Sequence, residues 1–326
     1  MLYYFLRRKF GYYYLYHFFP IVFFGFLNFN EIDIKNIYKI LHWLALFFCF
    51  FAIIQEVIYS PGFPIGDEVR FGIFRTPSLM GNSNLFGLYA VLFFMLDFSL
   101  YRKIRWQNIV FLVGIFLSVS RMAWLSLILC FLFLIMQNKK RSVKVLIFTI
   151  CFILIIVLIM LFGTHTLDEW SNEGYYRGYV MSKSLEIWRD SPILGVGPGM
   201  YGGVISVIFN SSIYNKYQFS QHWYDYGLKG FHSLDNFWFQ CLGELGIIGI
   251  IIFIILLVAL YQVARVESNK SKNGFRKKIL QGFSTIPILL FVYLFGSGLN
   301  FTPILLTYSI LLGLVLGIRN ESIIDK

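Results

Sequence analysis

Arginines that stand outside the dense basic clusters of the chain offer one kind of chemistry. A guanidinium presents a planar fork of donors that binds phosphate through two parallel hydrogen bonds, which the point charge of a lysine does not. Any one arginine is as compatible with a salt bridge to a neighbouring acid, but the group favours a phosphate or pyrophosphate ligand. Its members are Arg70, Arg75, Arg121, Arg177 and Arg189.

Arg121 lies within FLSVSRMAWLSLIL, between two apolar stretches that are each short for a full membrane span. A charge there costs about 2.5–3.5 kcal/mol at mid-membrane, so such a residue usually marks a site. The alternative is an arginine at a helix end that extends its charge to lipid phosphate.

A second polar group lies in FHSLDNFWFQCLGELGIIG, residues 231–249. A neutral imidazole at His232 can take a proton from a sugar hydroxyl, although a loop histidine is often only surface polarity. Asp235 and Asn236 are suited to cap a helix that begins at residue 237. Glu244, about two turns into that helix, is a carboxylate within an apolar run and is either functional or structural.

Two other patterns indicate no cofactor. The glycine-rich SPILGVGPGMYGG, residues 191–203, lacks the Lys-Ser/Thr of a phosphate loop, so we expect a tight, close-packed turn. The four cysteines have no CxxC spacing and lie in apolar runs, which favours packing or lipid contact over a metal or redox pair; they are Cys49, Cys130, Cys151 and Cys241.

Composition assigns the chain to the membrane. Of 326 residues, 58% are hydrophobic and 14% are charged, whereas soluble domains carry about 25% charge. Continuous apolar runs of about 20 residues, instead of alternating segments of about 10, exclude a transmembrane β-barrel. The net charge of +11 sits mostly in short loops, which indicates the positive-inside pattern and not nucleic-acid binding.

The apolar runs predict an all-α polytopic membrane protein with about nine helices and a large extracytoplasmic loop. The expected helices cover 11–29, 41–59, 84–100, 107–120, 122–137, 145–163, 237–263, 279–298 and 302–318. Basic clusters at 102–105, 139–144 and 265–278 place those segments in the cytoplasm, so 60–83, the bend at 120–121 and 164–236 lie outside.

Two expectations concern single segments. Residues 177–190 read as an amphipathic helix that ends at Ser191-Pro192. The same topology places Arg7, Arg8 and Lys9 outside, against the rule, so the first run is either interfacial or follows helices that this chain lacks.

The order of these pieces resembles the O-antigen ligase and polymerase superfamily of bacterial polysaccharide assembly. The matching features run over roughly residues 70–260: Arg70 before G-x-x-x-x-P-x-x-x-G-N-x-N, Ser120-Arg121 between helices, Arg177 before the glycine-rich turn, and D-N…E-L-G-I-I-G at a helix start. The resemblance implies a metal-independent glycosyltransferase of the C-type membrane class, without a cofactor. Its donor would be glycan on undecaprenyl pyrophosphate at the outer face of the bacterial cytoplasmic membrane.

The resemblance also implies roles for residues. Arg75, Arg121 and Arg177 match the outward-facing arginines that hold the pyrophosphate, with Arg70, Arg189, Asn236 and Glu244 in support. Many members have His-Asn eight residues before the glutamate, where this chain has Asp235-Asn236. Either Asp235 acts as the base or His232, one helical turn earlier, substitutes for the missing histidine.

The resulting domain scheme has three parts: 1–69, an N-terminal transmembrane region expected to be shortened; 70–263, the catalytic region with outer loop 164–236; and 264–326, a cytoplasmic loop and last transmembrane hairpin. We favour a polymerase of O-antigen or capsule over a ligase that transfers glycan to lipid A core. Expected partners are the lipid-linked donor, the glycan acceptor, the bilayer, a flippase and a chain-length regulator. A transporter or flippase and a catalytically inactive assembly partner are the competing classes.

Overall fold

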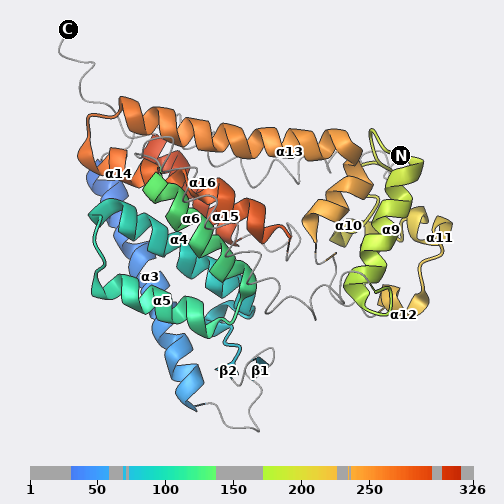
Figure 1. Cartoon of the computed structure of the whole chain (residues 1–326), viewed down its shortest axis with the longest axis horizontal. Coiled ribbons are helices and arrows are strands. Elements are labelled where there is room, and N and C mark those ends of the chain that lie inside the picture. The colour runs from blue at the N-terminus through green and yellow to red at the C-terminus, as the bar shows by residue number, and fades with distance from the viewer. Residues whose placement is uncertain are drawn as a thin grey trace. The chain divides into compact units, whose positions relative to one another are not determined.

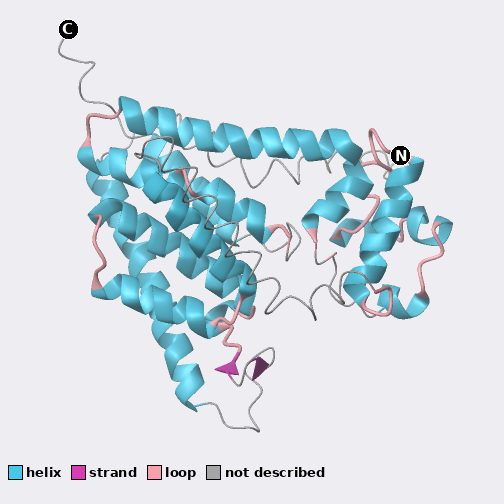
Figure 2. Ribbon diagram, viewed as in Figure 1, coloured by secondary structure: helices cyan, strands magenta, loops and turns pink. Residues whose placement is uncertain are grey.

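The computed structural model describes residues 31–58, 69–70, 73–136, 172–225, 234, 236–295 and 303–316 (Figure 1). Apart from one short antiparallel pair, β1 (Val69–Arg70) and β2 (Ile73–Phe74), the regular elements in these ranges are helices (Figure 2). The predicted all-α class is thus confirmed for these ranges, whereas the count of nine helices and the large outer loop stay predictions. The expected helices 11–29 and 145–163 lie outside the described residues.

The chain divides into two compact units. Unit 1 takes its described residues from Ile135–Leu256 and Leu294–Phe301, and unit 2 takes them from Leu15–Leu134, Leu257–Tyr293 and Thr302–Lys326.

Unit 2 is a helical bundle built around one buried helix. That helix, α4 (Ser83–Tyr101), is apolar on all sides and packs against α3, α5, α14, α15 and α16. Its neighbours are α3 (Glu31–Ile58), η1 (Ser78–Met80), α5 (Trp106–Leu117), α6 (Arg121–Met136), α14 (Gly274–Phe283), α15 (Ile286–Tyr293) and α16 (Pro303–Leu316).

Within the described ranges, three helices are long and apolar enough to cross a membrane: Ile32–Ile58, Ser83–Tyr101 and Phe237–Lys270. Large aliphatic side chains stay exposed along α13 (Phe237–Lys270), among them Ile251, Ile252 and Ile255. Apolar surface of this kind suits contact with lipid chains. The described cysteines Cys49, Cys130 and Cys241 are instead buried, which assigns them to packing.

Unit 1 contains a cluster of aromatic side chains that belongs to the long loop of the sequence. Its short helices are α9 (Tyr176–Asp190), α10 (Val204–Ile208), α11 (Ser212–Lys216) and α12 (Gln221–Trp223). Tyr201, Tyr214 and Tyr217 pack with Val180 and Ile187 at its centre. The described part of this loop therefore folds around a core of its own. The amphipathic helix predicted at 177–190 is confirmed as α9.

Some predicted helix boundaries were wrong. The helix expected over 41–59 begins at Glu31, and the helix expected over 237–263 continues to Lys270. The single span expected over 279–298 is two helices, α14 and α15, separated at Ser284 and Thr285. Their hydroxyls donate to the carbonyls of Gln281 and Gly282, local bonds that compete with a continuing helix.

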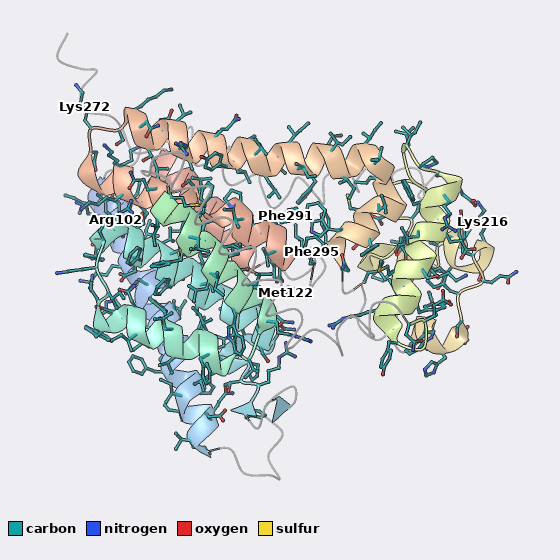
Figure 3. The ribbon with its side chains drawn as sticks, viewed as in Figure 1. Arg102, Met122, Lys216, Lys272, Phe291 and Phe295 are labelled. Atoms are coloured by element: carbon teal, nitrogen blue, oxygen red, sulfur yellow. The ribbon has the colours of Figure 1, made fainter. Side chains whose placement is uncertain are left out.

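Two basic clusters lie at one end of unit 2. The Ser99 hydroxyl donates to the carbonyl of Lys278, and the Arg102 guanidinium hydrogen-bonds to Gln281. Figure 3 places Arg102 and Lys272 at this end, and Met122, in the first turn of α6, at the other. The clusters at 102–105 and 265–278 therefore share an end, as the predicted topology requires.

Candidate active site

Arg75 occupies a short segment between β2 and η1 in unit 2. Its side chain is buried, with 8% of the residue exposed. Its Nη2 atom donates to Oδ1 of Asn84, 2.7 Å away, in the first turn of α4. One nitrogen of the guanidinium is therefore held by an uncharged side chain.

Asn84 also joins this segment to the turn before α6. The Ser120 hydroxyl donates to the same Asn84 Oδ1 over 2.8 Å, and the Thr76 amide donates to the carbonyl of Leu117 over 3.1 Å. Two predicted motifs, 70–84 and Ser120-Arg121, thus meet at one amide oxygen.

The backbone around Arg75 is held from several sides. The Ser83 hydroxyl donates to the Arg75 carbonyl over 3.2 Å, while Glu56 of α3 accepts from the Phe74 amide and the Thr76 hydroxyl. The Ser78 hydroxyl donates to the carbonyl of Phe48 over 2.7 Å. These bonds tie the segment that carries Arg75 to α3 and α4, and so preorganise the position of the guanidinium.

Asn82 and Ser120 explain where the two helices begin. Asn82 Oδ1 accepts from the Leu85 amide over 3.0 Å, and the Ser120 hydroxyl accepts from the Ala123 amide over 3.3 Å. Each is therefore a side-chain cap at the start of its helix. In the G-N-x-N motif, the first asparagine caps α4 and the second contacts Arg75.

Arg121 is the first residue of α6 and is partly buried. Unsatisfied amides give the start of a helix a partial positive charge, which disfavours a cation and favours an anion. A guanidinium at this position adds to that field. The predicted anion-binding residues Arg75 and Arg121 thus belong to segments that the Asn84 bond holds together.

In unit 1, the glycine-rich turn docks into a break in α13. Gly246 has φ +63° and ψ −159°, which interrupts the helical hydrogen bonds. The Ile247 amide donates instead to the Pro192 carbonyl, over 3.0 Å. In the other direction, the amides of Val196 and Gly197 donate to the carbonyls of Gly243 and Glu244, over 3.0 and 2.8 Å. Bonds between the two segments replace those lost in the helix.

Glycine is required at two points of this contact. Gly195 has φ +64°, and a Cβ atom there would overlap the backbone of Glu244. At Gly246 a Cβ atom would lie 2.5 Å from the Ile193 carbonyl oxygen. The close-packed turn predicted at 191–203 is confirmed, and its glycines allow two backbones to touch.

Glu244 is fully buried beside this turn. Its Oε1 accepts from the Tyr201 amide over 3.2 Å, and its Oε2 lies 3.5 Å from Nε2 of Gln240. The carboxylate thus anchors the end of the turn to the helix. These contacts support the structural role, and the functional role stays a prediction.

Tyrosine hydroxyls extend the network in unit 1. The Tyr201 hydroxyl lies 2.7 Å from the Ser184 hydroxyl of α9, and the Tyr214 hydroxyl accepts from the Gly202 amide over 2.9 Å. Burial raises the pKa of both Tyr201 and Tyr214 above the usual tyrosine value. Both phenols are therefore neutral hydrogen-bonding groups, not bases.

Asn236 caps α13 as the sequence predicts. Its Oδ1 accepts from the amides of Trp238 and Phe239, over 3.0 and 3.3 Å. Its Nδ2 donates to the carbonyl of Phe295 over 3.1 Å. Asn236 therefore both starts the helix and ties that start to residues 294–295.

The structure gives less detail for the remaining predicted site residues. Arg177 is partly buried in the first turn of α9, and Arg189 is exposed in its last turn. Arg70 is in β1, where only the backbone is described. The two candidate bases, His232 and Asp235, lie outside the described residues.

Comparison with known proteins supports a family for part of the chain. Residues 107–254 match the family model described as O-antigen ligase. The resemblance to the ligase and polymerase superfamily is thereby confirmed, and with the long apolar helices it indicates a bacterial membrane protein of a glycosyltransferase-like class. No curated protein matches the chain.

The matched segment contains most of the predicted site. Arg121, Arg177 and Glu244 lie within residues 107–254, as do both candidate bases. Arg75 lies before the segment, yet it reaches Ser120 through the shared Asn84 oxygen.

Asn84 was predicted as part of the G-N-x-N motif but was assigned no role from the sequence. Its signal was present: a second asparagine two residues after a helix cap, in the first turn of an apolar helix where an amide needs a partner. Among the described residues, no group of three or more His, Cys, Asp or Glu side chains could hold a metal ion.

Proposed function

We propose that this protein is a polysaccharide polymerase. It would join oligosaccharide repeat units carried on undecaprenyl pyrophosphate into O-antigen or capsular polysaccharide, at the outer face of the cytoplasmic membrane. The observation that carries this proposal is the buried Arg75 guanidinium, which an uncharged Asn84 orients beside the Ser120-Arg121 turn. A fixed cationic group of this kind suits a pyrophosphate.

The proposed reaction is a direct displacement at the donor sugar. A hydroxyl of the acceptor glycan attacks the anomeric carbon, its proton passes to His232 or Asp235, and the bond from that carbon to the pyrophosphate oxygen breaks. Undecaprenyl pyrophosphate leaves as the anion, and the configuration at the anomeric carbon inverts. The base would be the residue that holds the hydroxyl within hydrogen-bonding distance.

In this proposal, Arg75, Arg121 and Arg177 stabilise the charge that develops on the leaving pyrophosphate. Preorganised donors do this without reorganising during the reaction, which is why electrostatic stabilisation is commonly a large contribution to catalysis. The hydrogen bond from Arg75 to Asn84 supports such preorganisation, because it orients the guanidinium. No metal ion is needed in this scheme.

A ligase is the second candidate, and the matched family's description favours it. A ligase would use the same donor and transfer the finished glycan to lipid A core. A flippase that supplies the donor fits both candidates, whereas a chain-length regulator fits the polymerase.

The test is the length distribution of surface polysaccharide, separated by gel, in a strain that lacks this gene. Complementation uses the wild type, Arg177→Lys, His232→Ala and Asp235→Asn, with the exposed Lys216→Gln as a matched control. We expect the ladder to collapse to a single repeat unit without the gene and to return with the control. The His232 and Asp235 variants identify the base.

Other outcomes separate the alternatives. Loss of all lipid-attached glycan would assign the protein as a ligase. An unchanged ladder in the deletion strain would overturn both assignments and favour a transporter. A ladder that needs the gene but tolerates Arg177→Lys would indicate an assembly partner that does not bind pyrophosphate.

A further inference from the structure

A cavity of about 570 Å³ opens at the basic end of unit 2, far along the bundle from the first turn of α6. Helices α3, α4 and α14 and the loop before α5 surround it. The described side chains that line it include four basic groups and two buried polar groups: Lys35, Lys39, Arg105, Lys278, His42 and Asp97.

The charge of the lining favours an anionic ligand. Against the four basic side chains stands one carboxylate, Asp97. Lys39 and Lys278 are exposed, so their ammonium groups can move toward a ligand at the mouth. Basic pockets between membrane helices are a recurring kind of lipid-headgroup site.

The inner part of the cavity contains a buried carboxylate that lies near Arg105. Asp97 is 1% exposed, with Oδ1 3.9 Å from Nη1 of Arg105 and 3.8 Å from Nδ1 of His42. Its Oδ2 has almost no accessible surface, and the Asn108 side chain interacts with the same carboxylate. Asp97 therefore positions the neighbouring Arg105 and is not open to a ligand.

Aromatic residues place the cavity at membrane-interface depth. Trp43, which lines it, and Trp106 at the start of α5 are both half exposed, with ring centroids 6.2 Å apart. Tryptophan is enriched where the hydrocarbon core meets the headgroups. A ligand with acyl chains can therefore keep them in the bilayer while its headgroup enters the cavity.

We propose that this cavity binds the phosphate headgroup of an anionic phospholipid. The lysines and Arg105 hold the phosphate. A zwitterionic headgroup fits less well, because it brings a further cation among the basic side chains. The proposal does not depend on the catalytic function above.

The experiment titrates the purified full chain in detergent and counts bound ligand by native mass spectrometry. The probes are dihexanoyl phosphatidylglycerol, dihexanoyl phosphatidylcholine and sn-glycerol 3-phosphate. We expect phosphatidylglycerol to bind about tenfold or more tightly than phosphatidylcholine, because only the former is a net anion. The soluble headgroup should bind more weakly than the lipid, because it lacks the acyl chains.

A double variant tests the mouth of the cavity. Lys39→Gln with Lys278→Gln should weaken phosphatidylglycerol binding by about twenty-fivefold, since each lysine near the surface contributes about a factor of five. Lys270→Gln with Lys272→Gln removes the same charge outside the cavity and should leave binding unchanged. All four lysines are exposed, so these variants should fold, and the comparison between lipids needs no variant.

Three results would overturn the proposal. They are equal binding of the two lipids, equal weakening by the cavity and control variants, and displacement of the lipid by equimolar sn-glycerol 3-phosphate. The last result would assign the cavity to a soluble phosphate ester.

Discussion

Two polar sites in the described part of the chain, one around Arg75 and one around Gly246, are held together in opposite ways. Around Arg75, side chains make the connections: Asn84 accepts from Arg75 and Ser120, and Glu56 accepts from the neighbouring segment. Around Gly246, the backbone makes them, through amides and carbonyls exchanged between the turn and the broken helix. We define these as the side-chain site and the backbone site.

This difference leads us to expect that the side-chain site serves activity and that the backbone site serves stability. A site held by side chains can present one charged group at a fixed angle, but each side chain in it is individually replaceable. A backbone site tolerates few substitutions at its glycines, because any Cβ atom changes the fit. We therefore expect substitutions in the side-chain site to reduce activity and those in the backbone site to reduce stability.

The largest expected effect is at Arg75. Arg75→Lys should reduce polymer formation by about a hundredfold, comparable to the loss of one preorganised donor from an active site, while the protein still folds. The measurement is incorporation of labelled repeat units into polymer by membranes that contain equal amounts of each variant.

Arg102→Lys is the matched control, since Arg102 lies at the other end of unit 2 and hydrogen-bonds to Gln281. Its activity should stay within about twofold of the wild type, as expected for a surface substitution away from a site. Equal losses in the two variants would remove Arg75 from the proposed pyrophosphate site.

A smaller effect, on stability, is expected at Gly195. Gly195→Ala places a residue with φ +64° against the backbone of Glu244. Left-handed backbone costs about 1–2 kcal/mol and overpacking about 1–3 kcal/mol, so the variant should lose about 2–5 kcal/mol. Thermal unfolding in detergent and the rate of tryptic cleavage in 172–225 would both report it.

Two other glycines separate the causes of that loss. Gly81 has φ +68° but no atom near its Cβ position, and Gly274 has neither constraint. Gly81→Ala should therefore show only the backbone cost, and Gly274→Ala close to none. If Gly195→Ala resembles Gly81→Ala, the backbone site does not need the close approach.

Local signals in the sequence were sufficient to predict most of the described helices and several of the residues that cap them. Asn236 before an apolar run predicted the start of α13, and the pattern over 177–190 predicted α9. The break between α14 and α15 was missed, because Ser284 and Thr285 are compatible with an apolar helix until their hydroxyls bond to the preceding turn.

Contacts between motifs were less predictable. The sequence gives the order of the arginine motifs but not that Asn84 joins Arg75 to Ser120, because the partners are 36 residues apart. Likewise, Glu244 was predicted as a polar residue of undecided role. Its bond to the Tyr201 amide depends on how the turn folds back across 43 residues.

Substitutions at Glu244 also test the backbone site, with a smaller expected loss of stability than Gly195→Ala. Glu244→Ala leaves the buried Tyr201 amide without its acceptor, which should cost about 1–3 kcal/mol of unfolding free energy. Glu244→Gln keeps an acceptor oxygen and should lose less. The apparent unfolding temperature of the two variants decides between them, and an equal loss in both would show that the negative charge itself is needed.

The smallest expected effect is a pH dependence of the unfolding temperature, which arises from Asp190 and Tyr217 in unit 1. The Tyr217 hydroxyl donates to Oδ2 of Asp190 over 2.7 Å, and this bond, helped by Lys216, lowers the pKa of Asp190. A carboxyl whose pKa is lower in the folded state stabilises the fold above its unfolded pKa of about 3.9. That contribution is lost as pH falls through the folded pKa.

Tyr217→Phe removes the hydroxyl and should therefore reduce the unfolding temperature slightly at pH 6. The difference from the wild type should shrink as the pH falls below about 4, where Asp190 becomes protonated in the unfolded chain and then in the folded one. Asp190→Asn should remove the pH dependence in both backgrounds. A difference that stays constant from pH 6 to pH 3 would assign the effect of Tyr217 to packing in the aromatic cluster instead of to its bond with Asp190.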